Sequence, residues 1–208
     1  MKINYILDNL DIMIPNPKCE LDYNKDYELL IATVLSAQCT DARVNKVTKV
    51  LFDKYDIFGL SKANNKDIEN IIFSCGNYRK KSEYIISISK SFVKDYNGCV
   101  PNNRDYLEKL AGVGRKTTNV VLSNLFNVPC IAVDTHVDRV SKRLGLAKEK
   151  DNVFVVENKL MKKIPKDKWS RTHHQLVLFG RYICKSQSPN CKDCLLKEYC
   201  KYYKNNLL

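Results

Sequence analysis

No apolar run in the sequence approaches the roughly 18 residues that a membrane-spanning helix needs. The opening residues are amphipathic and lack the pattern of a secretory signal, and no repeat or low-complexity segment follows. We therefore expect an intracellular protein of the cytoplasm or nucleoid with no membrane part. In such a compartment the nine cysteines are not expected to form a disulfide scaffold.

Convincing β-strands are also missing, because no segment alternates apolar and polar residues over the length of a strand. Apolar residues instead recur at the spacing of one helix face. With 208 residues and 44% hydrophobic content, the chain can form one large or two small globular domains. The predicted helices cover 3–13, 27–37, 41–54, 65–73, 80–95, 103–110, 115–127, 135–144, 152–163 and 168–183. We expect an all-α protein.

Acidic residues are fewer than basic residues. The chain has 23 Asp and Glu residues against 35 Lys and Arg residues, and its formal net charge is +12. A surplus of this size favours a polyanionic partner, and it favours nucleic acid over a membrane surface. The composition alone is also compatible with a merely well-solvated surface.

A glycine-rich turn, Gly112-Val113-Gly114, interrupts the helical pattern between the helices predicted at 103–110 and 115–127. Glycine enters left-handed backbone conformations cheaply, so a tight hairpin is expected. Backbone N–H groups at the start of the second helix, together with the helix dipole, form a ready site for a phosphate. Such a site holds a nucleic-acid backbone without reading bases. An ordinary corner between two helices is the alternative.

Two ionisable residues follow the hairpin. Lys116 lies in the first turn of the second helix, and Asp134 follows in the segment Val-Asp-Thr-His. A lysine amine and a carboxylate on one groove can serve as a nucleophile and its electrostatic partner. Asp134 is equally well placed to cap the helix that begins at Thr135.

The last part of the chain carries a cysteine motif with the spacing C-x6-C-x2-C-x5-C, formed by Cys184, Cys191, Cys194 and Cys200. Four thiolates at this spacing can close around one metal centre, and both zinc and a 4Fe–4S cluster accept four sulfur ligands. The remaining cysteines show no ligand spacing, so they are interpreted as small buried residues: Cys19, Cys39, Cys75, Cys99 and Cys130.

Taken together, these motifs closely resemble the endonuclease III family of DNA base-excision glycosylases. The segment 35–41, Leu-Ser-Ala-Gln-Cys-Thr-Asp, is similar to a family segment, and the cysteine spacing is the family's cluster signature. The resemblance implies a six-helix barrel domain at 19–129 with a helix-hairpin-helix at about 105–127. It also implies an iron–sulfur domain made of 1–18 plus 130–208, a DNA groove between the two lobes, and a 4Fe–4S cluster as cofactor.

The resemblance also implies roles for individual residues. Lys116 would attack the sugar C1′ of a flipped nucleotide, expel the base and form a Schiff base before the strand is cut by elimination. Asp134 would stabilise positive charge on the sugar or shuttle protons. Gln38 would enter the vacated base stack, and Asn77 stands where the family usually has a large apolar wedge. The DNA backbone would be held by the hairpin and the residue after it: Gly112, Val113, Gly114 and Arg115.

The function expected from the resemblance is a monomeric bifunctional DNA glycosylase and AP lyase. It would act on oxidised or damaged pyrimidines, and on abasic sites, in double-stranded DNA. Three alternatives remain open at this point. They are a thymine or uracil mismatch glycosylase of the same superfamily, a non-catalytic helix-hairpin-helix module that binds DNA, and a metal-cluster protein with no DNA role.

Overall fold

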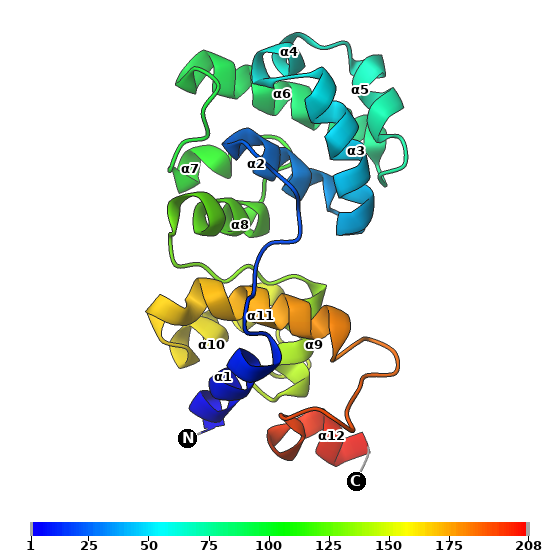
Figure 1. The fold of residues 1–208 in the computed structure, drawn as a ribbon. Helices are drawn as coiled ribbons and strands as arrows, with labels where there is room; N and C mark the ends of the chain where they lie inside the picture. Colours follow the sequence, from blue (N-terminus) through cyan, green and yellow to red (C-terminus); the bar gives the residue numbers. More distant parts are fainter. Residues whose placement is uncertain (1, 207–208) are drawn as a thin grey trace. The chain divides into compact units, whose positions relative to one another are not determined.

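The structure is a computed structural model that describes residues 2–206 of the 208-residue chain. Within that range all regular elements are α-helices or short 3-10 helices and none is a strand, which confirms the predicted all-α fold (Figure 1). The chain divides into two compact units. One is Cys19–Phe126, and the other combines the chain up to Lys18 with the chain from Asn127 onward, so the division falls a few residues before the expected boundary at residue 129.

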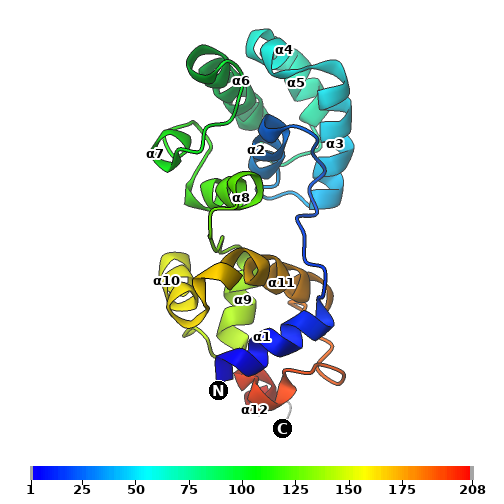
Figure 2. The same ribbon diagram turned by 60° about the vertical axis from the view of Figure 1, so that its left-hand side comes forward.

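A buried helix organises the unit Cys19–Phe126. Every side chain of this helix from Tyr27 to Leu35 is buried, as a sequence that is apolar nearly all round predicts, and the buried carboxylate of Glu28 accepts hydrogen bonds from the amides of Asn24 and Lys25. It packs against three other helices of the unit, α3, α6 and α8 (Figures 1 and 2). The helices of this unit are α2 (Asp26–Leu35), α3 (Asp41–Lys54), α4 (Ile57–Lys62), α5 (Asn65–Ile72), α6 (Tyr78–Tyr96), α7 (Arg104–Leu107) and α8 (Arg115–Phe126).

The short helix α4 was not predicted. With it, the described residues of this unit form seven helices where six were expected. The helix has only six residues and contains Gly59, a poor helix former, so no helical period is visible in its sequence. Asp56 caps it by accepting a hydrogen bond from the Gly59 amide at 2.7 Å. Ile57 and Leu60 are buried and the helix packs on α6, so tertiary contacts override the weak local preference.

The helix predicted at 103–110 is shorter than expected. It ends at Leu107 as α7, and the chain continues in tighter turns, in which the Leu110 amide donates to the Leu107 carbonyl at 3.1 Å. Turns of this kind commonly close the last turn of a helix. The chain therefore leaves the helix before it reaches the glycine hairpin.

The second unit joins the start of the chain to its last third. In Figures 1 and 2, α1, drawn in blue, lies among the yellow-to-red helices. Helices α1 and α9 both pack on α11. They share one apolar core, which includes Leu10, Val137, Phe179 and Leu196. The helices of this unit are α1 (Lys2–Met13), α9 (Thr135–Arg143), α10 (Val153–Lys163), α11 (Trp169–Tyr182) and α12 (Lys201–Asn206).

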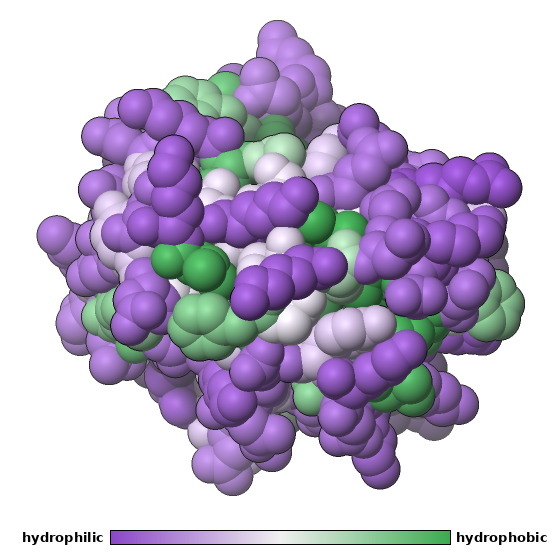
Figure 3. Space-filling view, turned by 90° about the horizontal axis from the view of Figure 1, so that it is seen from above, coloured by the Kyte–Doolittle hydropathy of each residue, from purple (hydrophilic) through white to green (hydrophobic). Residues whose placement is uncertain are grey.

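Most side chains on the face shown in Figure 3 are hydrophilic. On the face shown in Figure 3, hydrophobic side chains form small areas separated by hydrophilic ones. In the part of the chain that the structure describes, no helix is long and apolar enough to cross a membrane.

Candidate active site

The glycine hairpin forms a tight turn between α7 and α8. Gly112 has a φ of +79°, and the Val113 amide closes the turn by donating to the Leu110 carbonyl at 3.1 Å. A Cβ atom on Gly112 would lie 2.3 Å from Cδ2 of Tyr84, which is well inside contact distance. Glycine is therefore required at this position by the backbone conformation and by the neighbouring ring.

The second glycine of the hairpin is not required by the fold. Gly114 has no left-handed φ, and a Cβ atom built on it would meet nothing within 4 Å. Gly114 immediately precedes α8, and its carbonyl accepts the first helical hydrogen bond from the Thr118 amide at 3.0 Å. The missing side chain thus leaves open space beside the first turn of α8, where the helix dipole is suited to the approach of an anion.

The predicted nucleophile stands at this same helix end. Lys116 is exposed in the first turn of α8, as is Arg115 before it. From Thr117 to Ser123 the helix is buried, and it packs on α2. The amine therefore projects to solvent from an element whose backbone is fixed by the core, so a substrate bound at the hairpin can reach it.

Asp134 caps helix α9, as its position before Thr135 predicted. Its Oδ1 atom accepts hydrogen bonds from the amides of His136 at 2.9 Å and Val137 at 2.8 Å. Its Oδ2 atom lies 3.1 Å from Nδ1 of His136. The capping role does not exclude a chemical one, because one oxygen holds the helix and the other faces a titratable ring. Sequence reasoning missed the contact with His136, although the i, i+2 spacing at a helix start was visible.

Gln38 and Asn77, which come from separate segments of the sequence, lie together in the structure. The Asn77 side-chain amide donates to Oε1 of Gln38 at 3.4 Å, and both residues are exposed. The backbone angle φ is 55° at Asn77 and 56° at Gln38, in the left-handed region that residues other than glycine rarely enter. Such strain is often found at functional sites. We call residues 36–40 and 74–77 the paired loops.

Contacts made by Lys81 and by two cysteines hold the paired loops in place. The ammonium group of Lys81 donates to the carbonyls of Leu35 at 2.9 Å and Ala37 at 2.6 Å, and burial lowers the pKa of Lys81. Next to it, the Cys39 thiol donates to Sγ of Cys75 at 3.6 Å. The interpretation of the five scattered cysteines as small buried residues is confirmed for Cys75 and Cys130. It is wrong for Cys19 and Cys39, which are partly exposed, and for Cys99, which is exposed. No sequence spacing indicates the pair of Cys39 and Cys75.

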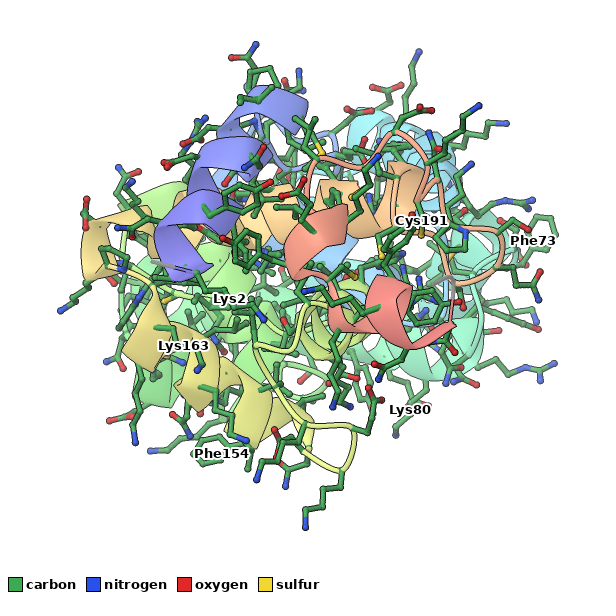
Figure 4. The ribbon with its side chains drawn as sticks, turned by 90° about the horizontal axis from the view of Figure 1, so that it is seen from below. Lys2, Phe73, Lys80, Phe154, Lys163 and Cys191 are labelled. Atoms are coloured by element: carbon green, nitrogen blue, oxygen red, sulfur yellow. The ribbon has the colours of Figure 1, made fainter. Side chains whose placement is uncertain are left out.

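The cysteine motif forms one group in the structure. A cavity in the second unit is lined mainly by apolar side chains and by Cys184, Cys191, Cys194 and Cys200, and Asn190 and Lys197 complete its lining. Figure 4 labels Cys191 on the segment between α11 and α12. Burial raises the pKa of the Cys191 and Cys194 thiols, and negative charge on the other cysteines of the group raises it further. A cationic centre would reverse that effect. Within residues 2–206, no three Cys, His, Asp or Glu side chains surround the position of a single ion.

Arg143 of α9 ties the cysteine segment to the rest of its unit. Its guanidinium donates to the carbonyls of Lys185 at 2.6 Å and Ser186 at 3.0 Å, and it lies 4.3 Å from the ring centre of Tyr202. It also lies 3.4 Å from Sγ of Cys184. Sequence reasoning missed this residue, since nothing in the local pattern of α9 indicates a partner more than 40 positions away.

Known proteins agree with this arrangement. The family model described as HhH-GPD superfamily base excision DNA repair protein matches residues 31–166. The chain is 51% identical over 204 residues to endonuclease III of Bacillus subtilis (strain 168), covering 96% of this chain and 92% of that protein. Two solved structures, a trapped covalent endonuclease III–DNA intermediate (an estranged-adenine complex) and a non-covalent endonuclease III–DNA complex, are each 51% identical with a TM-score of 0.95. They match 100% of this chain and 99% and 98% of their own.

The helical fold and the glycine hairpin thus define a base excision DNA repair protein of the HhH-GPD superfamily. Within that superfamily the chain belongs to the endonuclease III family, as the motifs of its sequence predicted.

Proposed function

We propose that the protein is a monomeric bifunctional enzyme that removes oxidised or damaged pyrimidines from duplex DNA and then cleaves the strand as an AP lyase. The observation that carries this proposal is the exposed amine of Lys116 on the first turn of α8, directly after the hairpin. The trapped covalent intermediate with DNA in a relative of 51% identity supports a covalent step. Acting on DNA, the enzyme would work in the cytoplasm or nucleoid.

The amine of Lys116 takes part in two steps, the removal of the base and the cleavage of the strand. A base inside a duplex is out of reach, so the damaged nucleotide is first flipped out of the stack. Nζ of Lys116 then attacks C1′, the bond from C1′ to the base breaks, and the base leaves with its electron pair and takes up a proton. Opening of the sugar ring gives a Schiff base between Nζ and C1′. Loss of a proton from C2′ then expels the 3′ phosphate and nicks the strand, and water releases the lysine.

Asp134 supplies charge to this reaction. Its carboxylate is held by two backbone amides, so it does not have to reorganise when positive charge develops on the sugar. Its second oxygen, beside His136, is placed to move a proton during elimination. Asp134 is therefore suited to a chemical role as well as to its role as the mainly buried N-cap of α9.

DNA would be held by the hairpin and read by the paired loops. Backbone N–H groups at Gly112 and Gly114, with the guanidinium of Arg115, are suited to a phosphate, and Val113 holds the turn through its own amide. Gln38 would enter the gap that the flipped nucleotide leaves, and its Oε1 atom is already oriented by Asn77. Asn77 offers a hydrogen-bonding wedge in place of an apolar one.

The four cysteines would hold a 4Fe–4S cluster. The fit rests on four thiols that line one mainly apolar cavity, because a 4Fe–4S cluster takes four cysteine thiolates as ligands. When bound, the cluster would cross-link the segment between α11 and α12 to itself through its four cysteines and would take no part in the reaction at the sugar. A zinc ion would instead require the four sulfurs around one centre.

Substitutions of the two hairpin glycines are expected to have separate effects, one on stability and the other on DNA binding. Gly112→Ala is expected to lower the free energy of unfolding by about 1–2 kcal/mol, because alanine is strained at positive φ and its methyl group meets Tyr84. Gly114→Ala is expected to leave the free energy of unfolding unchanged and to weaken binding to duplex DNA about tenfold, because the methyl group enters the phosphate space. Urea titration and fluorescence anisotropy measure the two effects. Unchanged DNA affinity in Gly114→Ala would argue against a phosphate at this position.

Arg143 is expected to stabilise the cysteine segment. Arg143→Ala removes charge-assisted hydrogen bonds to two carbonyls and should lower the free energy of unfolding by about 2 kcal/mol. Arg143→Lys keeps the charge but loses the planar fork of donors, so an intermediate loss is expected. Chemical denaturation followed by circular dichroism measures both variants. Equal stability of Arg143→Ala and the parent protein would show that the segment is held by other contacts.

The proposed function is tested with duplexes that carry thymine glycol or an abasic site, each incubated with the protein and borohydride. A covalent adduct with both duplexes supports a bifunctional glycosylase and lyase. An adduct with the abasic duplex alone would retain the lyase and refute the damaged-pyrimidine assignment. No adduct with either would favour a monofunctional glycosylase or a module that only binds DNA, and a duplex with a thymine mismatch distinguishes these two.

A further inference from the structure

We propose that Cys39 and Cys75 form a reversible intrachain disulfide when the protein meets a hydroperoxide or a small disulfide. We further propose that this bond locks the paired loops and slows base removal. The first half concerns only the two thiols. The second half rests on the proposed function, in which Gln38 and Asn77 of the same loops contact DNA.

The geometry favours the bond. The two Sγ atoms already lie 3.6 Å apart, although the cysteines are 36 positions apart in the sequence. A disulfide of about 2 Å requires the sulfurs to approach by only roughly 1.5 Å. Cys39 lies after the end of α2 and Cys75 after the end of α5, so neither is held inside a helix and both loops can adjust.

The surroundings assign different roles to the two thiols. Cys39 is partly exposed and can meet an oxidant, whereas Cys75 is 1% exposed. Burial, followed by the hydrogen bond with Cys39, raises the pKa of Cys75 to about 11, against the opposing effect of the Lys81 and Arg43 cations. Because an oxidant can reach Cys39 and cannot reach Cys75, Cys39 is the attacking thiol and Cys75 the resolving thiol.

The reaction balances with either oxidant. A hydroperoxide is attacked by the Cys39 thiolate, its O–O bond breaks, and the products are an alcohol and a sulfenic acid on Cys39. Cys75 then attacks that sulfur, loses its proton and expels water. With a small disulfide, Cys39 forms a mixed disulfide and releases one thiol, and Cys75 displaces the second. In both cases the two cysteines lose two electrons and the oxidant gains them.

The bond would act on the residues next to it. Gln38 immediately precedes Cys39, and Asn77 follows Cys75 by two positions, and both have left-handed backbones. A covalent bridge limits how far these loops can move, yet Gln38 has to move into the base stack. Base removal is therefore expected to fall about tenfold on oxidation, because small misplacement of a positioning group is costly. The hairpin is in another segment, so binding to undamaged duplex should change little.

The test uses the purified full chain with its cluster and oxidised glutathione, followed by peptide mapping and single-turnover base removal. We expect a peptide pair joined through Cys39 and Cys75, and a tenfold slower reaction that dithiothreitol restores. Cys99→Ser is the matched control, since Cys99 is exposed, and it should behave as the parent protein. Cys39→Ser should react at the same rate with and without oxidant, and Cys75→Ser should retain a mixed disulfide on Cys39 and give no joined peptide.

Two results would overturn the proposal. Absence of the joined peptide would refute the disulfide, and a joined peptide with an unchanged rate of base removal would refute its control of the loops. Base removal by the reduced protein tests the proposed function separately. Reduced protein that removes no base would overturn the proposed function even if the disulfide forms.

Discussion

Lys116→Gln is expected to abolish the covalent adduct that borohydride traps between the protein and an abasic duplex. Glutamine has a similar length but no nucleophilic amine, so no Schiff base can form. Lys116 is exposed on α8, and the buried part of that helix begins at the next residue. The substitution should therefore leave the thermal midpoint unchanged. Denaturing gel electrophoresis of the trapped reaction measures the adduct.

The neighbouring cation provides the matched control. Arg115→Gln removes one positive charge from the same exposed helix turn and leaves the amine in place. We expect weaker binding with a shallower dependence on salt, because one phosphate contact fewer is made, but a normal yield of adduct once the duplex is saturated. An adduct that survives Lys116→Gln would show that another amine is the nucleophile. Loss of the adduct in both variants would show that charge rather than the amine controls its formation.

Asp134→Asn is expected to slow single-turnover base removal by about 100-fold or more while the protein stays folded. Asparagine is as good an N-cap as aspartate, so the amides of His136 and Val137 keep their acceptor. Only the negative charge is lost. Asp134→Asn therefore removes the charge and keeps the helix cap, whereas Asp134→Ala would remove both. Base-release kinetics and thermal unfolding together measure the two effects.

A second cap in the same unit controls for stability. Asn152 caps α10 by accepting a hydrogen bond from the Val155 amide at 3.0 Å. Asn152→Ala should cost about 1 kcal/mol of stability without slowing base removal. If Asn152→Ala slowed the reaction as much as Asp134→Asn does, lost stability rather than lost charge would explain both. A normal rate in Asp134→Asn would exclude the carboxylate from the chemistry.

The parts of the fold that sequence reasoning predicts are those with a local cause. A uniformly apolar segment marks the buried helix α2, and the glycine at Gly112 marks a turn with positive φ. Asp134 before Thr135 marks the start of α9. The cysteine spacing marks a group of thiols that does share one cavity. In each case the residues that carry the signal are close together in the chain.

The parts that sequence reasoning misses depend on packing between distant segments. Helix α4 forms because α6 covers its apolar side chains, and nothing within six residues reveals that. The amide pair of the paired loops, the thiol pair below it and the support from Lys81 join segments about 40 positions apart. Periodicity reports which face of a helix is apolar, but it does not report which neighbour covers that face.

The shared core of α1 with α9 and α11 has a consequence for biosynthesis. The ribosome makes α1 before the unit Cys19–Phe126, and the helices that cover the apolar face of α1 emerge only after that whole unit has been made. That middle unit has its own core, so it can fold during translation while α1 waits. The first helix is therefore expected to remain uncovered, and open to chaperones, until the cysteine segment has left the ribosome.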